Sequence, residues 1–86
     1  MMNIQDKIKQ FIMEASDGNV TPEDLERVGD DIGRLGLDSL AKIKIVVLLE
    51  EAYDIETEVE EISPEVLNSI SRLAEFIEEE VQKVSV

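Results

Sequence analysis

Residues 36–53 read GLDSLAKIKIVVLLEEAY and contain the strongest helix signal of the chain. Asp38 has the side chain of a helix N-cap, and the apolar residues after it recur at helical spacing. We therefore expect a helix that starts at Asp38 or Ser39 and ends near Tyr53. On a wheel of about 100° per residue, one side of this helix should face a core. That side contains Ala41, Ile45, Leu48, Leu49 and Ala52, with Val46 and Tyr53 at its margin.

The opposite side of the same helix is unusual for a protein surface because it is apolar along its centre. An apolar strip with a charged border is typical of a protein docking surface. The strip consists of Leu40, Ile43 and Val47, with Lys44, Glu50 and Glu51 at its border and Ser39 at its N-terminal end.

Helical patterns also dominate the rest of the chain. A first helix is predicted from about Asn3 to Ser16, and a last helix begins near residue 68 or 69. The long connection over residues 17–38 should contain one helical turn at 21–25, where a cap precedes a proline, and the same pattern predicts a short helix at 63–67. The expected fold is all-α. It is a small four-helix bundle of three long helices and one short helix, with a long first loop, in a single domain over residues 1–86.

The charge balance limits the classes of partner. Eight Lys and Arg face twenty-one Asp and Glu, so the net charge is −13. This excess of acids excludes nonspecific binding to nucleic acid and disfavours anionic membranes, whereas it favours basic proteins as partners. The longest aliphatic run, Ile45 to Leu49, is far too short to span a bilayer. We expect a free-standing, monomeric, cytoplasmic protein.

Two missing residue types limit the chemistry. The chain has no Cys and no His. Disulfides, thiol catalysis, imidazole bases and metal sites made from these side chains are therefore excluded. We predict no catalytic residues and no metal ligands.

Ser39 places a hydroxyl at the start of the central helix. A phosphate ester at that point would meet free backbone N–H groups and the positive end of the helix dipole. Because the chain has no imidazole to activate Ser39, a separate enzyme would have to modify it.

The residues around Ser39 carry a family resemblance. Gly36-Leu37-Asp38-Ser39-Leu40 resembles the attachment motif of acyl carrier proteins. The similarity continues through Val46 and residues 49–51 and 53–54. It resumes at 62–65 and 69–74, and this last part is closer to the carrier domains of peptide and polyketide assembly lines.

The resemblance implies a specific modification and set of partners. A phosphopantetheinyl transferase would attach 4′-phosphopantetheine from coenzyme A to Ser39, and Asp38 would help to position the magnesium of that transfer. The thiol of the arm would carry an acyl group as a thioester. Acyl- or aminoacyl-loading enzymes and synthases would dock on the strip and its border. The protein itself would catalyse nothing.

The sequence departs from fatty-acid carriers on the docking helix. Those carriers usually have acids two and five residues after the serine, where this chain has Ala41 and Lys44, with Lys42 between them. Basic docking sites of general fatty-acid enzymes would meet Lys44 unfavourably. We therefore predict a dedicated fatty-acid, polyketide or related pathway.

Other interpretations remain open at this point. The chain could be an aminoacyl or peptidyl carrier, D-alanyl carriers included. In a different class, it could be an acidic helical adaptor without a prosthetic group, with Ser39 an ordinary first-turn residue. Leu35 or Leu37 could also fold over Ile43 and bury the strip.

Overall fold

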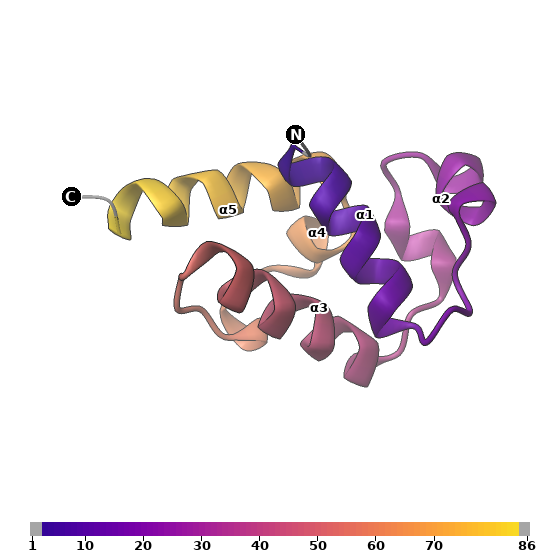
Figure 1. The fold of residues 1–86 in the computed structure, drawn as a ribbon, viewed down its shortest axis with the longest axis horizontal. Coiled ribbons are helices and arrows are strands. Elements are labelled where there is room, and N and C mark those ends of the chain that lie inside the picture. The colour runs from indigo at the N-terminus through magenta and orange to yellow at the C-terminus, as the bar shows by residue number, and fades with distance from the viewer. Residues whose placement is uncertain (1–2, 85–86) are drawn as a thin grey trace.

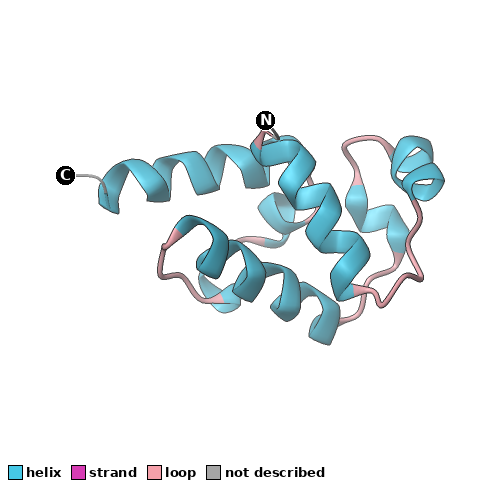
Figure 2. Cartoon of the chain, viewed as in Figure 1, coloured by secondary structure: helices cyan, strands magenta, loops and turns pink. Residues whose placement is uncertain are grey.

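The computed structural model describes residues 3–84, and within that range it contains helices, loops and one isolated bridge between Asp31 and Ser69 (Figures 1 and 2). This confirms the all-α prediction, because no strand forms in the described range. The long helices are α1 (Ile4–Ala15), α3 (Ser39–Tyr53) and α5 (Ile70–Val84). The short ones are α2 (Pro22–Val28) and α4 (Pro64–Leu67), with single 3-10 helices η1 (Ile32–Leu35) and η2 (Val59–Glu61).

The first long helix starts and stops where its local signals predict. The side chain of Asn3 accepts a hydrogen bond from the backbone N–H of Asp6 at 2.8 Å and so caps α1. At the other end Gly18 adopts φ +83°, and its N–H donates to the carbonyl of Met13 at 3.2 Å. A left-handed residue at this position ends a helix because it turns the chain away from the axis.

The long first connection is more structured than the predicted single turn. Thr21 and Asp24 form a capping box, in which each side chain accepts a hydrogen bond from the backbone N–H of the other, at 3.2 and 3.1 Å. This cap and Pro22 start a helix that continues to Val28, and η1 follows after a short turn. Two helical segments therefore lie between α1 and α3.

The core lies where α1 packs against α3 and α5 (Figure 1). Its most deeply buried large side chains come from these three helices. Several smaller elements add to it, because residues of α2, η1 and the segment after α3 are buried too. The most buried residues are Ile8, Ile12, Leu49, Leu73 and Ile77.

The predicted buried face of α3 is confirmed at its central positions and wrong at two others. Ala41, Ile45 and Leu49 are buried as predicted. Ala52, predicted to face the core, is exposed because it lies in the last turn, just before the chain reverses at Asp54 with φ +53°. Val46, predicted to be marginal, is buried because the segment that contains η2 folds back against α3.

No helix in residues 3–84 combines the length and the apolar character that a membrane span requires.

Candidate functional site

The site centres on the N-terminal end of α3, which begins as predicted. Asp38 caps the helix: its Oδ1 accepts a hydrogen bond from the N–H of Ala41 at 2.8 Å, and its carbonyl accepts one from Lys42 at 3.1 Å. The N–H groups of Ser39 and Leu40 are left without an acceptor in the helix. Ser39 is the first helical residue, and it is exposed.

Contacts with the core hold the segment that leads into Ser39 in place. Gly36 ends η1 in the left-handed conformation at φ +69° and ψ +33°, which an L side chain rarely adopts. Leu35 and Leu37, on either side of it, are half-buried and pack against the core. Because both leucines point inward, the Asp38–Ser39 turn that follows them is presented to solvent.

η1 also packs closely against Asn68, the residue that directly follows α4. A Cβ on Gly33 would lie 3.1 Å from the side-chain Cγ of Asn68, which is tighter than an ordinary contact. A Cβ at position 33 would therefore require the Asn68 side chain to shift by a few tenths of an ångström. The loop before Ser39 is therefore supported by α4 as well as by the core.

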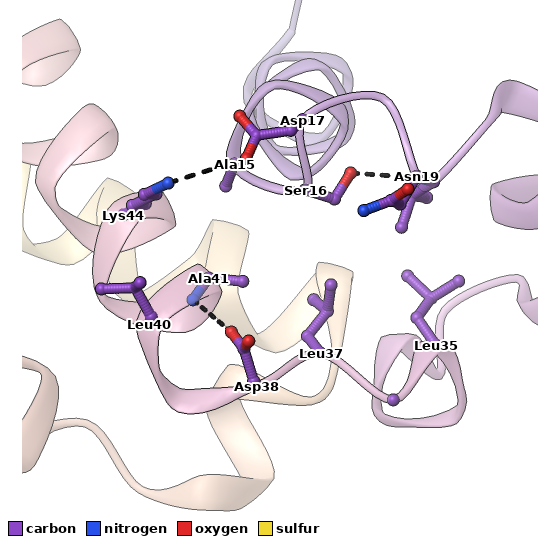
Figure 3. Close-up of a pocket in the computed structure, with 12 residues that line it drawn as sticks. Ala15, Ser16, Asp17, Asn19, Leu35, Leu37, Asp38, Leu40, Ala41 and Lys44 are labelled. Atoms are coloured by element: carbon purple, nitrogen blue, oxygen red, sulfur yellow. Dashed lines mark hydrogen bonds and ion pairs between the residues drawn. The ribbon is translucent and has the colours of Figure 1, made fainter.

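A pocket of about 280 Å³ opens between the N-terminal end of α3 and the end of α1 (Figure 3). Its lining includes Asp38 and Leu40, the two neighbours of Ser39 in the chain. Buried Ala15, Val20 and Ala41 contribute apolar surface to it. The pocket thus lies between the residues on either side of Ser39 and the end of α1, and Ser39 itself does not line it.

The wall of the pocket that comes from α1 is shaped by hydrogen bonds and one ion pair. Ser16 Oγ donates to the carbonyl of Met13 at 3.0 Å and accepts from the N–H of Val20 at 3.1 Å. Lys44 Nζ on α3 lies 4.0 Å from Asp17 Oδ2, so this pair joins α3 to the turn that follows α1 (Figure 3). Both side chains are largely exposed, so the pair adds little stability.

The predicted docking strip is exposed on α3. Leu40 is 61% exposed, Ile43 42% and Val47 44%, and among the described residues these are the exposed large hydrophobic side chains. Leu35 and Leu37 do not cover Ile43, because they pack into the core instead. At the border of the strip, Lys44 and Glu51 are exposed and Glu50 is half-buried.

One polar residue that supports the site was not predicted from the sequence. The Asp30 carboxylate, in the loop between α2 and η1, accepts hydrogen bonds from the hydroxyls of Ser69 and Ser71 and from the N–H of Ser71. The Ser69 bond is the main reason why the pKa of Asp30 lies below its usual value. Ser69 and Ser71, at the start of α5, could have suggested a capping site from the sequence alone. Nothing in the sequence indicated that Asp30 is their partner.

The arrangement presents an exposed hydroxyl at the start of a long helix. Ser39 has no imidazole to activate it, because the chain lacks His, and one oxygen of the neighbouring Asp38 carboxylate accepts the capping hydrogen bond. Within residues 3–84, no three Asp or Glu side chains cluster closely enough to hold a metal ion.

Comparison with known proteins identifies similar sequences. A family model described as "Phosphopantetheine attachment site" matches residues 15–77. Proteins named "Acyl carrier protein" from three strains of Buchnera aphidicola subsp. Acyrthosiphon pisum (Tuc7, 5A and APS) are 35% identical over 78 residues, which cover 91% of this chain and 92% of each relative. No solved structure gives a significant match. The matched range includes Ser39 and extends from the last turn of α1 into α5.

Proposed function

The chain belongs to the acyl carrier protein family, whose prosthetic group is phosphopantetheine, and on this premise we propose that Ser39 is the residue that carries the group. The single observation that carries the proposal is the position of its hydroxyl. Ser39 is an exposed side chain at the first position of a long helix, inside the motif Asp38-Ser39-Leu40. The arm attached there is 4′-phosphopantetheine.

The residues at this position fit a phosphodiester. The N–H groups of Ser39 and Leu40 have no acceptor within α3, and the helix dipole places partial positive charge at the same end. Such a terminus stabilises a nearby anion by about 0.3–1 kcal/mol. One carboxylate oxygen of Asp38 accepts the hydrogen bond from the N–H of Ala41. We propose that the other oxygen helps to hold magnesium during the transfer.

The side chains that this carrier contains determine which part of the transfer it performs and which part the transferase performs. Ser39 Oγ becomes an ester oxygen of the phosphodiester, the P–O–P linkage of coenzyme A breaks, and adenosine 3′,5′-bisphosphate leaves. The hydroxyl proton goes to a base of the transferase, because this chain has no imidazole. When bound, the arm supplies a thiol that holds cargo as a thioester. The carrier supplies only the attachment point and the docking surface.

The docking surface for loading and synthase enzymes is the apolar strip with its charged border. Leu40, Ile43 and Val47 offer apolar contact, and their large exposed fractions support this role. The border residues Lys44, Glu50 and Glu51 would set the orientation of the partner.

The charge of this border favours a dedicated pathway over general fatty-acid synthesis. Lys42 and Lys44 give the first half of α3 positive charge, whereas Glu50 and Glu51 give the second half negative charge. A partner whose docking site is uniformly basic would be repelled at the first half. We propose that the chain forms one monomeric carrier domain, acts in the cytoplasm and serves enzymes of a specialised acyl pathway.

The decisive experiment is intact mass spectrometry after incubation with coenzyme A, magnesium and a broad-specificity phosphopantetheinyl transferase. The parent protein should gain the mass of one phosphopantetheine, and Ser39→Ala should gain none. Ser63→Ala is the matched control, because Ser63 is also an exposed serine at the start of a helix. It should be modified like the parent.

Two outcomes would contradict the proposal. A mass gain in Ser39→Ala would place the arm on another residue. A folded parent that gains no mass with several transferases would favour the acidic adaptor, in which Ser39 has no modification to carry.

A further inference from the structure

Asp30, in the turn between α2 and η1, is bonded to the start of α5 through both its backbone and its side chain. Its carbonyl accepts a hydrogen bond from the N–H of Ile70 at 3.1 Å. Its carboxylate accepts from the N–H of Ser71 at 2.7 Å, from the Ser71 hydroxyl at 3.0 Å and from the Ser69 hydroxyl. Because an ionised acceptor makes stronger hydrogen bonds than a neutral one, these contacts fasten the turn to the first turn of α5.

The three residues that follow this turn continue the contact with the core and with the junction between α4 and α5. Asp31 forms the isolated bridge with Ser69, and Ile32 is 2% exposed in the core. Gly33 lies against the side chain of Asn68. The anchored region thus extends from the turn into η1.

η1 connects this anchor to the turn that presents Ser39. Residues 31–38 are all that lies between Asp30 and Ser39, and four of them form η1. Leu35 and Leu37, at the far end of this segment, are half-buried and pack against the core. A chain of regular turns and packed side chains carries a displacement from one end to the other.

The position of the Asp38–Ser39 turn decides how well an enzyme can use it. The transferase must meet the Ser39 hydroxyl and the Asp38 carboxylate in one geometry, and a misplacement of about 1 Å can cost on the order of 10²-fold in rate. A turn that samples several positions binds only in the right one. Its apparent affinity for the enzyme therefore falls in proportion to the fraction of molecules that are in that position.

We propose that Asp30 is a positioning residue for the modification of Ser39. It fastens the segment before Ser39 to the start of α5, and so holds the Asp38–Ser39 turn where a partner enzyme binds it. This inference rests on the proposed attachment at Ser39. Asp30 acts through η1 and not on the reacting atoms. Its loss should therefore weaken binding of the carrier and leave the chemical step unchanged.

Transferase kinetics with the carrier as the varied substrate test this split. Asp30→Ala should raise the KM for the carrier about three- to tenfold and keep kcat within about twofold of the parent value. Asn3→Ala is the matched control, because it also removes a helix cap: the Asn3 side chain accepts from the N–H of Asp6 at the start of α1. It should keep the KM of the parent.

Hydrogen exchange of the unmodified proteins tests whether the anchor reaches η1. The N–H groups of Arg34 and Gly36 donate to carbonyls within this segment, at 3.2 and 3.5 Å. Asp30→Ala should speed the exchange of both amides, as well as of those in the first turn of α5. Asn3→Ala should leave them unchanged. A cap that acts only on its own helix would change exchange in α5 alone.

A conservative variant keeps the test decisive. Asp30→Asn retains an oxygen that can accept from the N–H of Ser71 but removes the charge, so its KM should lie between those of the parent and Asp30→Ala. If Asp30→Ala does not fold, Asp30→Asn decides by the same two measurements.

The outcomes separate this inference from the proposed function. A parent that gains no phosphopantetheine contradicts attachment at Ser39, whatever the exchange rates are. If the parent is modified, an unchanged KM in the Asp30 variants overturns the positioning role alone. An equal rise of KM in Asn3→Ala, a fall of kcat at unchanged KM, or faster exchange confined to α5 would overturn it as well.

Discussion

Asp30 and Ser71 lie 41 positions apart in the chain, yet the Asp30 carboxylate accepts a hydrogen bond from the backbone N–H of Ser71 at 2.7 Å. The carbonyl of Asp30 also accepts one from the N–H of Ile70 at 3.1 Å. Ser69 is the local cap, and its hydroxyl accepts from the N–H of Arg72 at 3.3 Å. The start of α5 is therefore capped twice, once by its own sequence and once by the loop that leads to Ser39.

Removing this second cap should destabilise the protein. We expect Asp30→Ala to lower the free energy of unfolding by about 1–2 kcal/mol, because it leaves the Ser71 N–H without its acceptor. Urea unfolding followed by circular dichroism measures the change. Asp31→Ala is the matched control, since the Asp31 side chain makes no capping hydrogen bond. It should change stability by less than about 0.5 kcal/mol. Equal losses in the two variants would contradict the cap.

The contribution of Asp30 should depend on pH in one direction. Hydrogen bonds from Ser69, followed by those from Ser71, hold the pKa of Asp30 below its usual value of 3.8 in spite of partial burial. A carboxyl whose pKa is lower in the folded state stabilises the protein above its unfolded pKa, and this contribution is lost as the pH falls through the folded pKa. The stability difference between the parent and Asp30→Asn should therefore be constant near neutral pH.

That difference should shrink between about pH 5 and about pH 2, where the parent carboxyl becomes protonated. Urea unfolding of both proteins across this range provides the measurement. A difference that grew as the pH fell would show that the ionised form of Asp30 is not the stabilising one.

Two leucines of α3 should respond in opposite ways to truncation. Leu49 is 1% exposed and Leu40 is 61% exposed, although both lie on the same helix. Leu49→Ala should cost about 2–5 kcal/mol of stability because it leaves a cavity in the core. Leu40→Ala should stay within about 0.5 kcal/mol of the parent and should instead slow modification at Ser39. Thermal unfolding and transferase kinetics separate the two effects, and a large stability loss in Leu40→Ala would contradict an exposed docking strip.

Asp38 should have two separable roles, one in the helix and one in the transfer. Asp38→Ala removes the hydrogen bond to Ala41 and should cost about 1 kcal/mol. Asp38→Asn keeps an N-cap side chain but removes the charge, so its stability should remain close to that of the parent. If the carboxylate helps to hold magnesium, both variants should be modified slowly. Normal modification of Asp38→Asn, measured by intact mass against time, would restrict Asp38 to capping.

Reversal of the charge at Lys44 should change which enzymes accept the carrier. We expect Lys44→Glu to raise kcat/KM with the malonyl-loading enzyme of a general fatty-acid system, because a basic docking site would then meet an acid. Its stability should change by less than about 1 kcal/mol, since the pair with Asp17 is exposed. Lys83→Glu, at the far end of α5, controls for net charge. A similar gain in both variants, or none in Lys44→Glu, would argue against a specific role for Lys44.

The helix starts and the outward strip were predictable from local sequence. Asp38, Thr21 and Ser63 cap the helices that directly follow them, so each start depends on a few neighbouring residues. The periodicity of residues 39–53 likewise placed Leu40 and Val47 opposite the core, because side-chain direction on a helix follows from spacing alone. Local chemistry was sufficient for these features.

Contacts between residues far apart in the chain depend on the packing of the helices and were not predictable from the sequence. Val46 became buried because the segment around η2 folds back on α3, and Ala52 became exposed because the chain turns away after it. The pocket at the N-terminal end of α3 and the cap from Asp30 to Ser71 likewise join segments far apart in the chain. Such contacts depend on how whole helices pack against one another, and helical periodicity specifies which face is buried but not which element covers it.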